Sequence, residues 1–234
     1  MIQVPNTGFP AGSVILAAGH QPRHHEFQDS LANVLVPQGT AFRLVQSCDV
    51  AGNFNKGIRL LTGDWAWFLG DDHEFAPDTL LRLLARQVEV VVPITPCKQP
   101  FGYPFVLHGR NGEWRDDLQT YSWAELSGPD LLPLGQGDFV GQAGMLVQRP
   151  VLDRIGYPWF KCGQFDKGRL QEDMWFCHEL QELGYTIWLD PTIVFDHYMW
   201  TKVTARRIDG VWTPTLDFNT HTMVLQGLET RVAC

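Results

Sequence analysis

The chain has 234 residues, a formal net charge of -8 and a hydrophobic fraction of 44%. This length is sufficient for one α/β domain, because a chain of this size buries roughly 70% of its unfolded surface. The negative charge disfavours non-specific binding to nucleic acid or to an anionic membrane. The five cysteines are odd in number and include no Cys-x-x-Cys pair, which argues against a disulfide framework or a zinc ribbon.

The beginning of the chain lacks the basic start and the apolar run of a signal peptide. Elsewhere, no apolar stretch is long enough to cross a bilayer. We therefore expect a cytoplasmic protein without a membrane partner.

The first half of the chain alternates short apolar runs with helical patterns. Strands are expected at residues 13–17, 42–45, 65–69 and 88–92. Helices are expected at residues 27–34, at residues 53–61 and from about residue 77 onward. This β-α-β-α-β-α-β order predicts a mostly parallel sheet with helices on both faces, whose ligands bind beyond the carboxyl ends of the strands.

The second half is richer in aromatic residues, glycine and proline. After a loop-rich stretch at residues 98–140, the pattern predicts a strand at 145–147 and helices at 150–155 and 172–183. Gly184 stands where a left-handed helix cap is expected. Two further strands are expected at residues 186–189 and 192–195, joined by a turn at Asp190-Pro191.

Asp71 and Asp72 directly follow the apolar run at residues 65–69. Adjacent carboxylates raise one another's pKa because their negative charges repel, and a bound divalent cation offsets this repulsion. Oxygen ligands with one imidazole suit Mn²⁺ or Mg²⁺, and Asp72 with His197 would supply them. The alternative is that both aspartates cap the following turn.

The run at residues 67–80, WFLGDDHEFAPDTL, resembles the strand, acidic motif and helix of GT-A-fold glycosyltransferases, whose acidic motif is usually Asp-x-Asp. The resemblance implies a Rossmann-like GT-A sheet in a single domain and a nucleotide-sugar donor, with a UDP-sugar as first choice. Gly70 stands at the first acidic position. Asp72 therefore aligns with the usual metal ligand, Asp71 is a donor contact or a further ligand, and His73 is a candidate to replace the missing carboxylate.

Residues 170–177, LQEDMWFC, are similar to the Glu-Asp motif at a helix start in the large, mainly inverting glycosyltransferase family. The resemblance implies that Asp173 is the catalytic base and that Glu172 orients it or the acceptor. Backbone amides in the first helical turn are expected to keep Asp173 ionised. The alternative is that both carboxylates only complement the helix dipole.

Residues 192–197, TIVFDH, resemble the late strand and histidine that complete the metal site in this superfamily, although a lone histidine such as His197 is often structural. The resemblance covers residues 14–198. It predicts a nucleotide-sugar-binding half at residues 1–96 and an acceptor-binding, catalytic half at residues 97–234 of the same domain.

The loop after the first strand, at residues 17–20, and Asp49 after the second strand are expected to flank the nucleoside, because open α/β sheets bind ligands at that edge. Residues 49–56 resemble the stretch before the donor-contacting helix of this superfamily. The donor contacts are expected from Ala17, Gly19, His20, Asp49, Asn55, Lys56, Asp71 and Asp72. The acceptor contacts are expected from Gly144, Trp159 and Trp175. A solvated helix face for Lys56 and core packing for the two tryptophans remain the alternatives.

These motifs predict a metal-dependent glycosyltransferase that resembles compact phage or viral members, which would place it in the host cytoplasm. The resemblance implies a glycan or a hydroxymethylated DNA base as the acceptor, and it favours inversion over retention. Basic residues near the motifs support the DNA acceptor: Lys161, Lys167, Arg169, Lys202, Arg206 and Arg207. A nucleotidyltransferase and a non-catalytic sugar- or nucleotide-binding module remain alternatives.

Overall fold

A computed structural model describes residues 5, 7–19, 24–46, 49–97, 104–108, 119–128, 130–165, 168–198, 202–208, 211–217 and 222–224. The chain divides into two compact units, Met1–His197 and Tyr198–Cys234. The second unit contains an antiparallel sheet of β15 (Lys202–Ile208), β16 (Val211–Asp217) and β17 (Thr222–Val224). The site described below lies within the first unit.

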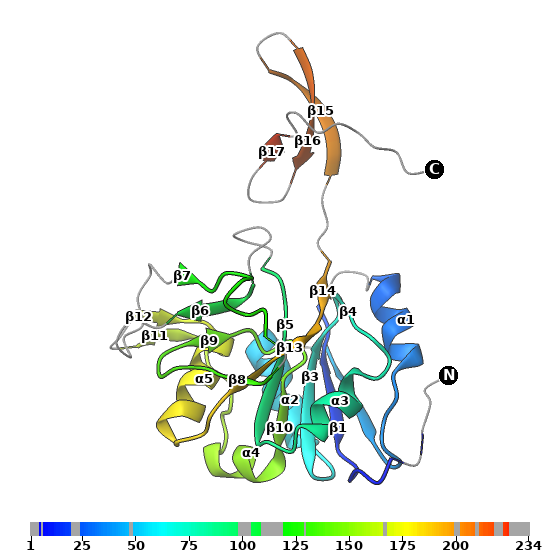
Figure 1. Ribbon diagram of the computed structural model, residues 1–234, viewed down its shortest axis with the longest axis vertical. Helices are drawn as coiled ribbons and strands as arrows, with labels where there is room; N and C mark the ends of the chain where they lie inside the picture. The colour runs from blue at the N-terminus through cyan, green and yellow to red at the C-terminus, as the bar shows by residue number, and fades with distance from the viewer. Residues whose placement is uncertain are drawn as a thin grey trace. The chain divides into compact units, whose positions relative to one another are not determined.

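A seven-stranded sheet in the order β2-β1-β3-β10-β5-β13-β8 forms the centre of the first unit (Figure 1). Strands β2, β1 and β3 are parallel, as are β5 and β13, whereas β10 and β8 run antiparallel to their neighbours. The predicted mostly parallel sheet is therefore confirmed. Its strands are β1 (Ser13–Ala17), β2 (Ala41–Val45), β3 (Trp65–Gly70), β5 (Val90–Ile94), β8 (Leu132–Pro133), β10 (Leu146–Gln148) and β13 (Trp188–Val194).

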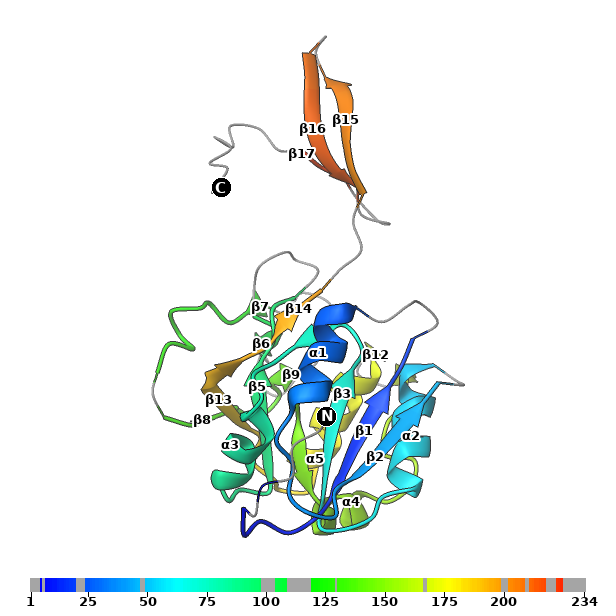
Figure 2. The ribbon, with the colours of Figure 1, turned by 90° about the vertical axis from the view of Figure 1, so that its right-hand side faces the viewer.

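Helices cover both faces of this sheet (Figure 2). Because side chains alternate along a strand, Val14 and Leu16 of β1 belong to one core cluster while Ile15 belongs to the other. The cluster around Val14 includes α1 and α3, and the cluster around Ile15 includes α2, α4 and α5. The helices are α1 (His25–Asn33), α2 (Val50–Arg59), α3 (Thr79–Ala85), α4 (Arg149–Ile155) and α5 (Glu172–Glu182).

Local sequence signals explain where two of these helices begin and end. Helix α2 begins after Asp49, whose Oδ1 accepts a hydrogen bond from the amide of Gly52 at 2.7 Å. Helix α5 ends before Gly184, which has the predicted positive φ of 82°. The amide of Tyr185 then donates to the carbonyl of Leu180 at 2.9 Å, which closes the last turn.

The prediction of two strands joined by an Asp190-Pro191 turn is wrong, because β13 continues through both residues. Asp-Pro is typical of exposed turns. Here Asp190 is completely buried and its carboxylate binds Arg86 and Thr192, so the strand continues with an irregularity instead of reversing.

Short strands surround the carboxyl end of the large sheet. The pair β4 (His73–Glu74) and β14 (Asp196–His197) lies at its upper end in Figure 1. A second group contains β6 (Val106–His108), β7 (Gln119–Thr120) and β9 (Phe139–Val140), and β11 (Gly163–Phe165) pairs with β12 (Gly168–Leu170). The chain thus brings residues from both of its halves to one edge.

Candidate active site

A cavity of about 550 Å³ opens at the carboxyl ends of β1, β3 and β5 and at the amino-terminal ends of α2 and α5. This is the edge at which ligands bind in open α/β sheets. Its lining comprises Ala17, Ala18, Gly19, Asp49, Val50, Asn53, Phe54, Gly70, Asp71, Asp72, His73, Thr95, Phe105, Gly141, Gln142, Ala143, Gln171, Glu172, Asp173 and His197.

The two adjacent aspartates after β3 face different partners. Oδ2 of Asp71 accepts a hydrogen bond from the amide of Gly19 at 3.0 Å. Asp71 therefore anchors the loop after β1 through Gly19, a predicted donor contact, and Ala17, the other, is the last residue of β1. His20, predicted in the same loop, lies outside the described residues.

Asp72, His73 and His197 form a cluster whose potential ligand atoms all lie within 4.8 Å of one another. Oδ1 of Asp72 lies 2.8 Å from Nδ1 of His73, and Oδ2 lies 3.5 Å from Nε2 of His197. The two imidazole rings stack with centroids 4.1 Å apart. A carboxylate with two imidazoles is a donor set that suits first-row divalent cations.

Pairing of β4 with β14 accounts for this convergence, because it sets His197 opposite His73. Nδ1 of His197 lies 2.9 Å from the carbonyl oxygen of Pro96, which fixes the ring with Nε2 toward Asp72. A hydrogen bond of this kind orients a metal-binding imidazole. The residues present therefore fit a divalent cation.

The other side of the cavity carries Asp173 in the first turn of α5. Asp173 is 5% exposed, and its Oδ1 accepts the amide of Met174 at 2.7 Å. Burial, followed by repulsion from Glu172, raises the pKa of Asp173 to about 7. The sequence-based expectation that backbone amides keep this carboxylate ionised therefore underestimates burial, because the amide hydrogen bonds lower the pKa by less than burial raises it.

Glu172 is half-buried beside this carboxylate and lines the same cavity. Its Oε2 accepts a hydrogen bond from the thiol of Cys162 at 3.2 Å. Burial and the carboxylate of Glu172 raise the pKa of Cys162 to about 11, so the thiol remains protonated at neutral pH.

Two predicted donor contacts on α2 are not among the cavity-lining residues. The side-chain amide of Asn55 donates to the carbonyl of Phe160 at 2.8 Å and accepts from its amide at 3.0 Å. These bonds attach α2 to the loop after α4. Lys56 is exposed. Asp49 does line the cavity. The hydrogen bond that its carboxylate accepts from the first turn of α2 holds its side chain in place.

The three predicted acceptor contacts are also absent from the lining. The carbonyl of Gly144 accepts the indole N–H of Trp67 at 2.9 Å, and its φ of 79° requires glycine. Trp159 donates its own indole N–H to the carbonyl of Leu152 at 2.7 Å.

Trp175 is half-buried, and the ammonium of Lys161 lies 4.2 Å from the centroid of one of its rings. The side chains of the other basic residues proposed for a DNA acceptor lie outside the described part of the chain.

Sequence reasoning missed Thr95, Phe105 and Gln142, which line the cavity. Thr95 is 4% exposed, and its Oγ1 has no hydrogen-bond partner among the described residues. The available signal was position, since Thr95 follows β5 just as Asp71 follows β3. Phe105 lies in the loop-rich stretch at residues 98–140 and Gln142 just after it, and no periodic pattern marks either residue.

Among the described residues, no helix combines the length and the apolar character that a membrane crossing requires. Comparison with known proteins gives a match of residues 25–140, about half of the chain, to the model of glycosyl transferase family 2. No curated protein matches the chain.

Two solved structures share the fold. A197 from STIV has a TM-score of 0.52 at 12% identity, covering 80% of this chain and 86% of that one. GalNAc-T7 with UDP, GalNAc and Mn²⁺ also has a TM-score of 0.52, at 10% identity, covering 85% of this chain and 44% of that one. The chain thus spans less than half of GalNAc-T7 but most of A197.

Proposed function

We propose, on the premise that this chain belongs to the glycosyltransferases of the GT-A fold, that it moves a sugar from a nucleoside diphosphate to an acceptor hydroxyl with the help of a divalent cation. One observation carries the proposal: the cluster of Asp72, His73 and His197 and the buried carboxylate of Asp173 line the same cavity.

Asp72 and His197 are the proposed metal ligands, with His73 as a third. Asp71, whose place in the acidic motif also made it a candidate ligand, is proposed as a donor-side residue because it binds the amide of Gly19. A bound Mn²⁺ or Mg²⁺ would neutralise negative charge on the departing diphosphate. The protein contributes a preformed group of donors, in which the carbonyl of Pro96 orients His197.

Asp173 is the proposed base. The acceptor oxygen attacks the anomeric carbon, the bond from that carbon to the diphosphate oxygen breaks, and the acceptor proton passes to a carboxylate oxygen of Asp173. The nucleoside diphosphate leaves with the electron pair. A base with a pKa of about 7 accepts this proton readily near neutral pH. Attack on the face opposite the leaving group would invert the configuration at the anomeric carbon.

The donor is proposed to be a UDP-sugar, with support from the UDP bound in the GalNAc-T7 structure. Ala17, Gly19 and Asp49 line the part of the cavity formed by the ends of β1 and the start of α2, and are proposed to contact the nucleoside. The proposed acceptor is a glycan or a hydroxymethylated DNA base. Dependence of acceptor binding on salt separates the two, because only a DNA strand releases bound counterions.

The proposal is tested by incubating the purified chain with UDP-sugars and Mn²⁺ and measuring UDP release. Asp72→Asn and His197→Ala should each lower Mn²⁺ affinity by at least about 10- to 100-fold, as measured by titration calorimetry. Asp78→Asn is the matched control, because Asp78 is an exposed aspartate outside the cavity. Wild-type Mn²⁺ affinity in both site variants would contradict the ligand assignment.

A further inference from the structure

Strand β13 contains an irregularity just before it reaches the candidate metal site. Its Asp190 pairs with Pro93 of β5, and its Val194 pairs with the next residue, Ile94. Three residues of β13 therefore have no counterpart on β5. An insertion of this kind changes which side chains face each side of the sheet. It therefore determines the side that every later residue of the strand faces. His197 lies three residues after Val194.

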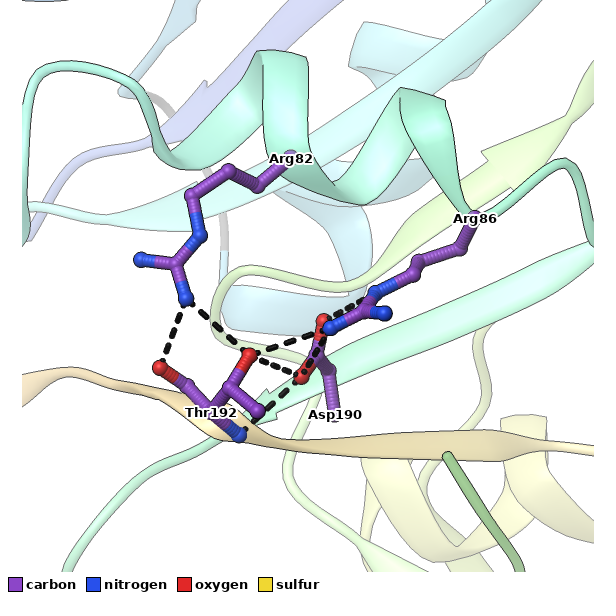
Figure 3. Close-up of polar contacts among 4 residues, drawn as sticks. All are labelled: Arg82, Arg86, Asp190 and Thr192. Carbon is purple, nitrogen blue, oxygen red and sulfur yellow. Dashed lines mark hydrogen bonds and ion pairs between the residues drawn. The ribbon is translucent and has the colours of Figure 1, made fainter. Parts of the chain in front are cut away.

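A buried carboxylate holds this irregularity in shape (Figure 3). The side chain of Asp190 is completely buried, and Arg86 binds both of its oxygens, with Nε at 2.7 Å and Nη2 at 3.0 Å. Oδ1 also accepts the amide of Thr192 at 3.0 Å and its hydroxyl at 2.6 Å. Although burial alone would raise the pKa of Asp190, the bonds from Arg86 and Thr192 lower it.

Arg82 adds a second connection from α3, one helical turn before Arg86 (Figure 3). Its Nη2 donates to the carbonyl of Thr192 at 2.8 Å and to the hydroxyl at 3.0 Å. Nη2 of Arg86 also donates to this hydroxyl at 3.0 Å. Thr192 is thus bound through its amide, its carbonyl and its side chain.

This network joins the two segments that carry the histidines of the cluster. Helix α3 follows β4, which contains His73, and β13 leads into β14, which contains His197. The intervening Phe195 is fully buried, stacks on Phe75 at 5.2 Å and donates its amide to the carbonyl of Ile94 at 2.8 Å. A shift of Thr192 would therefore be transmitted to His197 through a tightly packed segment.

We infer that Arg82, Arg86, Asp190 and Thr192 are positioning residues that set the register of β14 and thereby hold His197 opposite His73. The part of this inference that concerns a metal ion rests on the proposed function. Because replacing an ion pair in a protein interior by apolar packing often costs little stability, we assign the pair of Arg86 and the buried Asp190 a geometric role. None of the four residues lines the cavity, so none touches the substrate there.

The test uses Arg82→Met and Thr192→Val, which remove hydrogen bonds without deleting the buried carboxylate. The matched control is Arg43→Met. Arg43 likewise donates to a carbonyl, that of Leu60 at 2.9 Å, and to a threonine hydroxyl, that of Thr62 at 3.3 Å, but these contacts lie away from the cavity. A loss of general stability should therefore be similar in Arg82→Met and Arg43→Met.

Two readouts report on the position of His197. The first is the NMR signal of its imidazole in the metal-free protein, assigned with His197→Ala, because a ring stacked on His73 has a shifted resonance. The second is Mn²⁺ affinity. In Arg82→Met and Thr192→Val the signal should move and Mn²⁺ affinity should fall about tenfold, whereas Arg43→Met should change neither. In a His197→Ala background, Thr192→Val should have no further effect on Mn²⁺ affinity.

An unmoved His197 signal in both variants would overturn the inference, as would equal changes in the Arg43→Met control. Failure of the proposed function gives a different result. If the wild-type chain binds no Mn²⁺, the metal assignment is lost, while the metal-free NMR comparison still decides whether the network positions His197.

Discussion

Two carboxylates on opposite sides of one cavity have contrasting surroundings. Asp72 is 31% exposed in its side chain and lies beside two imidazoles. Asp173 is 5% exposed, and the charge that raises its pKa is that of another carboxylate, Glu172. The first environment favours binding of a cation and the second favours binding of a proton. The same side chain thus suits two tasks because the fold surrounds it differently.

The largest expected effect comes from removing the proposed base, Asp173. Asp173→Asn should lower the rate of transfer by about 10²- to 10⁴-fold, because an amide cannot take the acceptor proton. The affinities for Mn²⁺ and UDP should remain near wild type, since the cluster of Asp72, His73 and His197 is intact. Product formation and calorimetric titration measure the two quantities. Transfer at the wild-type rate would refute the assignment of the base.

The same substitution should stabilise the protein at alkaline pH. The pKa of Asp173 is about 7 in the folded protein and ordinarily 3.8, so Asp173 loses its proton at a lower pH in the unfolded chain. Stability therefore falls as pH rises between these values, and the loss persists above pH 7. Asp173→Asn removes this loss, so its free energy of unfolding at pH 8 should exceed that of wild type by up to about 4 kcal/mol.

Urea unfolding at pH 8 and pH 4.5 checks this prediction. The advantage of the variant should shrink at the lower pH, where wild-type Asp173 retains its proton in the folded state. A larger advantage at pH 4.5 than at pH 8 would contradict the sign.

The smallest effect concerns the influence of one carboxylate on the other. Repulsion from Glu172 is the second cause of the raised pKa of Asp173, so Glu172→Gln should lower that pKa. The rate of transfer should rise with pH through about 7 in wild type and through a lower pH in the variant, with a shift of about one unit or less. Glu125→Gln, outside the cavity, is the control. A shift to higher pH would be the wrong direction.

The sequence predicted the regular parts of the fold because their signals are local. Buried parallel strands such as β1 and β3 appear as short apolar runs, and Gly184 marks the end of α5 where its φ requires glycine. The prediction of a turn at Asp190-Pro191 was wrong because Asp190 binds Arg86, which is 104 residues away in the sequence, and is buried within a strand. A pattern within a few residues cannot reveal such a partner.

The predicted site residues likewise lie at the cavity where their signal was local, and lie elsewhere where their contacts depend on tertiary packing. Asp71, Asp72 and Asp173 stand at the ends of recognisable elements, and all three line the cavity. Asn55 and Trp159 instead bind backbone groups whose positions depend on tertiary packing. Thr95 was missed because a single hydroxyl after a strand carries no distinctive pattern.

The position of β10 in the sheet limits where the chain can be truncated. This strand comes from residues beyond 145, yet it lies between β3 and β5 and pairs with both. A fragment that ends at residue 140 would leave two apolar strands with unpaired edges, which favour aggregation. During synthesis, β3 and β5 can therefore become neighbours in one sheet only after β10 has been made.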